Sequence, residues 1–327
     1  MRNSHLIWIP SLQTNVRFLE ITNAQYRAIL KNLDDDTLLD FLYTINTIIT
    51  ENLIEPINSN NFTIVDRFII MMYLKILCYG PFLKLSKECD ICGKTININI
   101  DLNSLLDEIA PKLDKPFGKT ITSINNPFEI ICDLPTIHQE YIDLLYHHNK
   151  NTLKNLDNEI DGLFTSFIRD IKISGTSLNL DTLAVEQRNE VIPQLPANLL
   201  LNIRNNFIEP LYKDFNDVIF LDLKCDSCKT NDAIKMETRN LIFLLKLFFK
   251  DNDLGGVLKD YLNLTSVGRM NESFLDIITP KELSIFTEYV MSSQKQSNPI
   301  PQQHNDIDLF ANELDGKPRS DSEFSGF

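Results

Sequence analysis

Apolar residues recur at helical spacing along much of the chain. Positions i, i+3 and i+4 share one face of a helix, and in residues 36–53 such a stripe consists of Leu38, Phe41, Leu42, Ile45 and Ile49. Similar spacing predicts helices over residues 22–33, 63–76, 104–109, 137–148, 152–171, 182–191, 197–212 and 257–262, the last after a break at Gly255 and Gly256. Residues 241–250 are apolar all round, which predicts a helix buried in this chain or against a partner.

Two of these patterns begin at residues that cap helices. Thr63 opens the helix over 63–76, with Asp66 placed for capping. The clearest start is at Thr279, which is followed by Pro280 at the first helical position and by Glu282 at the third. Together these residues form a capping box and predict a last helix behind Thr279.

Other segments alternate apolar and polar residues with the period of two that marks a half-buried strand. Residues 5–9 and 16–21 predict an N-terminal hairpin, with Trp8 in the core or at an interface. Residues 82–85 with 95–102, 119–124 with 128–132, the two sides of Gly175 within 171–180, and the segment 218–237 predict four more strand pairs. We therefore expect an α+β protein in which helical bundles are combined with short antiparallel β-hairpins.

Two of the predicted hairpins turn at a Cys-x-x-Cys pair. These pairs supply four cysteines, Cys89, Cys92, Cys225 and Cys228. Four thiolates from two such knuckles suit a tetrahedral Zn²⁺, because the two-residue spacer lets both sulfurs of a knuckle reach one ion. The sequence thus favours a structural, zinc-ribbon-like site, and four Cys ligands leave no open position for catalysis.

Two other interpretations of these cysteines stay open: buried small hydrophobic residues or free thiols on unrelated turns, and disulfides. Gly93 follows the first pair, as expected where the backbone needs a positive φ, whereas Lys229 follows the second. Six cysteines without a signal peptide at the start indicate a reducing compartment, which disfavours disulfides.

The composition of the chain limits its possible functions. The chain has 327 residues, of which 43% are hydrophobic, and a formal net charge of −14, which disfavours binding to a phosphate backbone as the main task. A zinc-ribbon nucleic-acid-binding protein is the alternative, and it would need the lysines near both knuckles to cluster on one face. The longest apolar stretches, 68–77 and 241–249, each contain a lysine and are shorter than the roughly 20 residues needed to span a bilayer.

No enzyme motif is present. The sequence has no Gly-rich phosphate loop, no G-x-S-x-G elbow and no H-E-x-x-H. His147 and His148 are adjacent, so on a helix their side chains diverge by about 100° and do not readily share one ion; we expect exposed histidines at a helix end. The chain is therefore predicted not to be an enzyme, although an unfamiliar site is a further alternative.

The pattern divides the chain into three parts. Residues 1–135 form an N-terminal α+β region with the first Cys-x-x-Cys hairpin, and residues 136–293 a mostly helical region with the second. Residues 294–327 are rich in Gln, Ser, Asn, Pro and acidic residues, so this tail is expected to be disordered alone. Its apolar residues suggest partner-binding anchors, with a passive solvated tail as the alternative; the anchors are Leu309, Phe310, Leu314, Phe324 and Phe327.

The order of these features resembles the T4-type bacteriophage baseplate proteins, the hub-assembly or bridge-type subunits of contractile tails. The likeness rests on Ile9-Pro10-Ser11 after a strand, a helical segment, the Cys-x-x-Cys-Gly hairpin, and a later Cys-x-x-Cys hairpin leading into an apolar helix that ends in Phe248-Phe249. The stretches 254–256 and 277–283 are similar in kind to that family's C-terminal region. The likeness covers roughly residues 5–290; the long tail and Lys229 depart from it.

The resemblance implies a non-enzymatic virion protein that acts by contacts. It would link or assemble subunits around the hub of a contractile tail baseplate, with a structural zinc as a brace. Its partners would be other phage tail and baseplate subunits in a hetero-oligomeric assembly, with neither nucleic acid nor membrane. It would be located in the virion tail and, during assembly, in the host cytoplasm.

Overall fold

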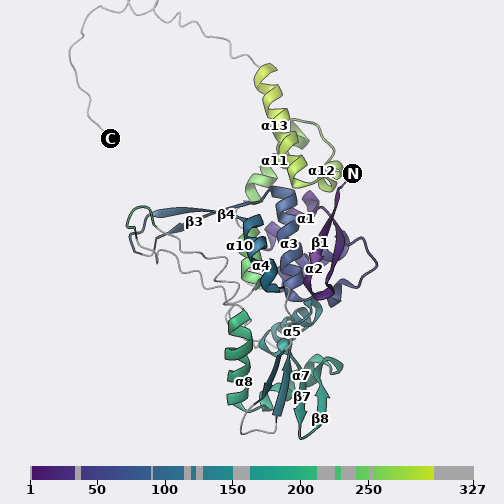
Figure 1. Ribbon diagram of the computed structural model, residues 1–327. Helices are drawn as coiled ribbons and strands as arrows, with labels where there is room; N and C mark the ends of the chain where they lie inside the picture. The colour runs from purple at the N-terminus through teal and green to yellow at the C-terminus, as the bar shows by residue number, and fades with distance from the viewer. Residues whose placement is uncertain are drawn as a thin grey trace, which may run out of the picture.

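The computed structural model describes residues 2–33, 38–89, 91–113, 119–122, 128–149, 163–211, 225–229, 241–249 and 254–297. The fold is rich in helices and contains small antiparallel sheets, which confirms the predicted class (Figure 1). The described helices are α1 (Asn23–Lys31), α2 (Leu38–Asn52), α3 (Ile64–Tyr79), α4 (Leu102–Leu113), α5 (Ile137–Asn149), α7 (Val185–Val191), α8 (Ala197–Ile203), α10 (Leu241–Phe249), α11 (Leu254–Ser266), α12 (Glu272–Ile277) and α13 (Pro280–Ser297).

The described strands form three separate antiparallel sheets. Two are hairpins, β1 (Ser4–Ile9) with β2 (Thr14–Leu19), and β3 (Phe82–Glu88) with β4 (Thr95–Asp101). The third has the order β5-β6-β7-β8 and consists of β5 (Lys119–Thr122), β6 (Phe128–Cys132), β7 (Ile168–Ile173) and β8 (Thr176–Asn179). Gly175 turns between β7 and β8 with φ of 88°, a conformation that glycine adopts without a steric penalty.

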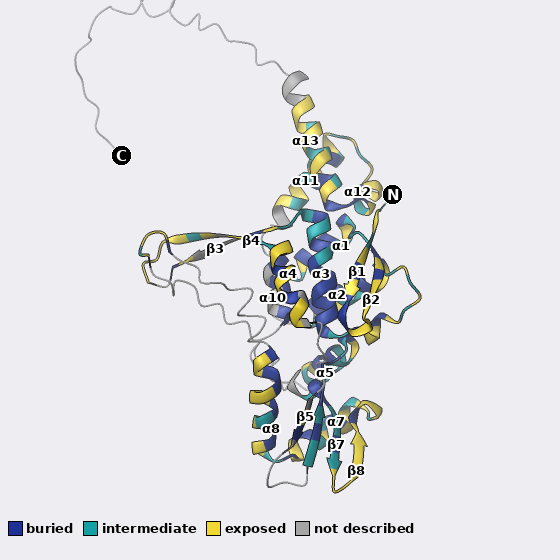
Figure 2. Ribbon diagram, viewed as in Figure 1, coloured by how far each residue is buried: buried dark blue, intermediate teal, exposed yellow. Residues whose placement is uncertain are grey.

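The core lies around α3, most of whose residues are buried (Figure 2). The helix starts where expected: the N–H of Asp66 donates to Thr63 Oγ1, and the N–H of Thr63 donates to Asp66 Oδ2. The apolar helix α10 packs on α3, with the ring centroids of Phe68 and Phe248 5.6 Å apart. The predicted burial of the helix over residues 241–250 is thus confirmed within this chain at the positions whose burial is described, Leu241, Ile242, Leu245, Lys246, Phe248 and Phe249.

The C-terminal helices α11, α12 and α13 pack around a small apolar cluster of their own. The capping box at Thr279 is confirmed, since the N–H of Glu282 donates to Thr279 Oγ1. Helix α1 attaches this unit to the core: the N–H of Asn23 donates to the carbonyl of Ile278 (2.7 Å), and Arg27 pairs with Asp276. No helix in the described part of the chain is both long and apolar enough to cross a membrane.

Three sequence-based expectations need correction, and a fourth is narrowed. The helix predicted over 152–171 is wrong at its end, because Leu163–Phe167 is a 3-10 helix and β7 follows, paired with β6 and β8; residues 152–162 lie outside the described part. Gly255 and Gly256 lie within the first turn of α11, where few backbone hydrogen bonds depend on them. Helix α13 continues to Ser297, beyond the position where the composition changes. Trp8 is 36% exposed, which excludes the core and leaves the other predicted place, an interface, untested.

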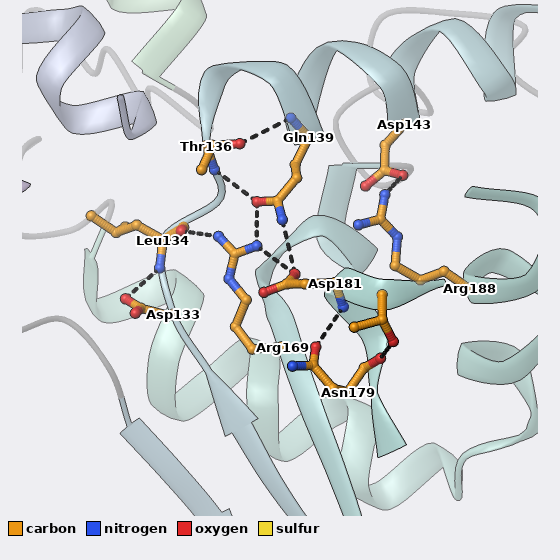
Figure 3. A network of polar contacts seen from close by, with 10 residues as sticks. Asp133, Leu134, Thr136, Gln139, Asp143, Arg169, Asn179, Asp181 and Arg188 are labelled. Carbon is orange, nitrogen blue, oxygen red and sulfur yellow. Dashed lines mark hydrogen bonds and ion pairs between the residues drawn. The ribbon is translucent and has the colours of Figure 1, made fainter. Parts of the chain in front are cut away.

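A polar network joins α5 to the four-stranded sheet (Figure 3). Arg169, on β7, donates to the carbonyl of Leu134 and to Gln139 Oε1, and it pairs with Asp181 at 3.0 Å. Gln139 also forms the capping box of α5 with Thr136 and donates to Asp181 (2.8 Å). These bonds fix the start of α5 over the end of the sheet. The four-stranded sheet contains strands from both sides of the predicted boundary between the regions 1–135 and 136–293. That boundary stays a prediction.

A buried carboxylate in this region makes stability depend on pH. Burial raises the pKa of Asp143 to about 6, although Arg188 beside it acts in the opposite direction. Because the folded-state pKa exceeds the unfolded one, the stabilisation associated with this group is complete below about pH 4 and is lost as the pH rises through about 6.

We therefore expect Asp143→Asn to remove part of the pH dependence of unfolding. Between about pH 4 and 7 the wild type should lose roughly 1–3 kcal/mol relative to the variant. Urea denaturation of both proteins across this range measures the difference. A gap between wild type and variant that is constant with pH would contradict the expectation.

Candidate metal centre

The hairpin β3–β4 carries the first cysteine pair at its turn. Cys89 follows β3 directly, and its N–H donates to the carbonyl of Lys94 (2.9 Å), which extends the strand pairing by one step. The N–H of Gly93 donates a hydrogen bond to the carbonyl of Cys89 (2.9 Å), and Gly93 has φ of 68°. This tight turn brings Cys89 and Cys92 onto one side of the hairpin tip.

The second pair repeats this turn. The N–H of Lys229 donates to the carbonyl of Cys225 (2.8 Å), and Lys229 has φ of 60°. Lys229 therefore occupies the left-handed conformation that Gly93 occupies in the first knuckle. The strands predicted on either side of the second pair lie outside the described residues, so its assignment to a hairpin stays a prediction.

The two knuckles meet with their sulfurs together. Cys89 Sγ lies 3.7 Å from Cys228 Sγ, and Cys92 Sγ lies 3.6 Å from Cys225 Sγ. All four sulfurs lie within 4.8 Å of one another. Four Zn–S bonds of about 2.3 Å in a tetrahedron require S···S distances of about 3.8 Å, so this donor set and its spacing fit a zinc ion.

The site is half enclosed. Cys89 and Cys225 are buried, Cys228 and Ile96 are partly buried and pack against this pair, and Cys92 is exposed. Exposure of one ligand gives an ion a path from solvent, while the buried pair restricts water. Four sulfur ligands fill the coordination of a tetrahedral ion, so the arrangement supports a structural role.

The thiols differ in acidity. The N–H of Lys94 donates to Cys92 and lowers its pKa, but desolvation and hydrogen bonds to the neighbouring cysteines raise the pKa of Cys92 to about 11. The backbone N–H groups of Cys228 and Ser227 lower the pKa of Cys225. Clustered sulfurs cannot all become thiolates without a nearby positive charge, and a divalent cation would supply it while releasing protons.

Comparison with known families gives an independent result. The family model described as T4 bacteriophage base plate protein matches residues 1–244. The chain belongs to this family. No curated protein and no solved structure gives a significant match.

Family membership confirms the resemblance found in the sequence up to residue 244 and indicates a structural role in a phage tail baseplate. The likeness of stretches 254–256 and 277–283 to the family's C-terminal region lies beyond the match and stays a prediction. All four cysteines lie inside the matched region, so the candidate metal centre is part of the baseplate family portion of the chain. Helices α11 to α13 lie beyond it.

The other candidate residues do not form a second site. His147 and His148 end α5 as predicted, but His147 is half-buried, and burial lowers its pKa. Among the described residues, the four cysteines are the only group of three or more His, Cys, Asp or Glu side chains placed to share a metal ion. Leu309, Phe310, Leu314, Phe324 and Phe327 lie outside the described part.

The remaining two cysteines stand apart from the cluster. Cys78 and Cys132 are buried, and burial raises the pKa of each thiol to about 12. They behave as small apolar core residues.

Lys229 offers a test of the knuckle turn. A non-glycine residue in the left-handed region carries a steric cost of about 1–2 kcal/mol, so Lys229→Gly should stabilise the metal-bound protein by up to about 1 kcal/mol. Gly93→Ala should do the opposite, since alanine would have to adopt φ of 68°. Thermal unfolding of both variants measures the two shifts, and equal shifts of the same sign would contradict the assignment.

Proposed function

We propose that this chain is a non-enzymatic assembly protein of a contractile tail baseplate, which links subunits around the hub and contains one structural zinc. The observation that carries the proposal is the meeting of four cysteine sulfurs within 4.8 Å in a chain of the baseplate family. Four sulfurs make a closed tetrahedral site, which braces a structure but leaves no position for substrate.

The shape of the β3–β4 ribbon, which carries the first cysteine pair at its tip, explains what the zinc would do. Figure 1 shows β3–β4 projecting sideways from the helical core as a two-stranded ribbon, and an isolated ribbon of this kind is marginally stable in water. The paired sulfurs are separated by 139 and 133 residues in sequence. A cross-link between such distant segments restricts the unfolded chain strongly, so zinc would stabilise the folded ribbon.

Exposed apolar side chains support a role based on protein contacts. Leu262, Ile277, Ile285 and Tyr289 on the C-terminal helices are each more than half exposed, so each could bury apolar surface against a partner. The tail that follows α13 would add its anchors, Leu309, Phe310, Leu314, Phe324 and Phe327, to such contacts. The partners we propose are other baseplate subunits, met in the host cytoplasm during assembly.

The charges near the two Cys-x-x-Cys pairs do not favour the alternative function, nucleic-acid binding. Lys84, Lys94 and Lys229 are exposed, and the exposed acids Glu88 and Asp226 lie among them in sequence. The side chains of Lys87, Lys224 and Lys235 lie outside the described part of the chain. A nucleic-acid-binding protein needs a concentrated basic surface. Binding to DNA or RNA that weakens steeply with salt would contradict the proposal.

The experiment that tests this function is the isolation of tails and baseplate intermediates from infected cells. We expect the chain to co-sediment with at least one of them, and we expect baseplate assembly to stop when its gene is disrupted. Normal baseplates without the chain, together with its absence from every intermediate, would overturn the proposal.

A further inference from the structure

The outer edge of β1 is an open strand edge. In the register of β1 with β2, Leu6 faces Arg17 and Trp8 faces Asn15. The N–H of Arg17 donates to Glu55 Oε2 (2.8 Å), and its carbonyl accepts from the N–H of Ile54 (3.0 Å). Both main-chain groups of Arg17 therefore point away from β1.

The direction of these groups fixes the rest of the ladder. Opposed residues in an antiparallel pair alternate between hydrogen-bonded and non-hydrogen-bonded pairs, so Leu6 and Arg17 form a non-hydrogen-bonded pair. The same alternation places the N–H and C=O groups of Ser4, Leu6 and Trp8 on the side away from β2. Within the described parts of the chain, no hydrogen bond reaches these groups.

The side chains on this edge are apolar and exposed. Ile7 and Ile9 point into the core, whereas Leu6 is 59% and Trp8 36% exposed on the opposite face. Figure 2 shows β1 with exposed positions along its length. Proteins usually protect an edge strand with lysine, proline or a bulge, and β1 contains none of these.

Unpaired main-chain groups are best matched by another main chain. We propose that β1 accepts an extended segment of a neighbouring baseplate subunit as an added strand, a mode of recognition in which the backbone supplies affinity and alternate side chains supply specificity. The segment would carry apolar residues at alternate positions against Leu6 and Trp8, and an acidic residue near Arg17, which is exposed on the same face. This inference rests on the proposed baseplate function.

Proline at position 6 tests the strand directly. Leu6→Pro removes an N–H that points away from β2, so it should leave the β1–β2 ladder intact while blocking the added strand. Trp8→Lys is a second variant, because a lysine on an edge strand opposes pairing. Leu201→Lys is the control, since it places the same charge at an exposed apolar position on α8.

The readout is incorporation into baseplates, measured by quantitative mass spectrometry of purified particles. We expect both β1 variants to be incorporated at least tenfold less than wild type while keeping its metal content and thermal unfolding, and Leu201→Lys to behave as wild type. A photoreactive p-benzoylphenylalanine in place of Trp8 should cross-link to one segment of a different subunit.

Normal incorporation of Trp8→Lys, or a cross-link to β1 of a second copy, would overturn this inference. A cross-link confined to residues of the same chain would also overturn it. Failure of the wild type itself to enter baseplates would instead contradict the proposed function, so the two failures are distinguishable.

Discussion

Replacing Cys225 with serine is expected to abolish stoichiometric zinc binding and to destabilise the protein. Serine lacks the thiolate that zinc prefers, and loss of one of four ligands should weaken binding by more than about 100-fold. At saturating zinc, a hundredfold loss corresponds to about 2.7 kcal/mol of stability. Metal analysis of the purified variant and thermal unfolding with and without a chelator measure both effects.

A matched control lies in the same knuckle. Ser227 is exposed, lies between Cys225 and Cys228, and contributes no side-chain ligand. Ser227→Ala should retain one zinc and the unfolding temperature of the wild type. If Cys225→Ser retained its metal, or if both variants lost it equally, the four-cysteine assignment would be wrong.

Replacing Arg67 with methionine is expected to cost about 3–5 kcal/mol of stability. Arg67, on α3, is fully buried and pairs with Glu140 of α5 at 2.5 Å, and the Glu140 side chain is 3% exposed. Removing one partner leaves the other as an uncompensated buried charge. Urea denaturation at constant pH measures the loss.

The double variant Arg67→Met with Glu140→Leu separates the charge from the packing. It should recover much of the lost stability, because well-packed apolar residues can replace a buried ion pair with little cost. Disrupting the exposed pair of Arg204 and Glu209, each more than half exposed, should change stability by less than about 1 kcal/mol. Equal losses in the single and double variants would contradict a dominant role for the ion pair.

Local features were predictable because their physical cause is local. The capping boxes at Thr63 and Thr279 depend on residues three positions apart, and both form as expected. The alternation in residues 95–102 likewise predicts β4. The spacing within each cysteine pair predicted a metal site, and only the fold could bring the two pairs together.

The remaining features depend on contacts between distant segments. Strand β7 pairs with β6, although α5 lies between the two strands in sequence. This pairing overrides the helical spacing of the residues in β7. Nothing local marks Arg67 as a buried residue, since its burial depends on Glu140 on another helix. Because position 229 is a lysine and not a glycine, the sequence did not predict a positive φ there, yet its backbone adopts the same left-handed conformation as Gly93.

The proposed zinc site can be tested by native mass spectrometry of the purified 327-residue chain. We expect the mass of one chain with one bound zinc, which is lost on treatment with a chelator and restored when zinc is added. A chain that contains no metal when prepared in zinc, or whose mass shows disulfides among Cys89, Cys92, Cys225 and Cys228 under reducing conditions, would contradict it.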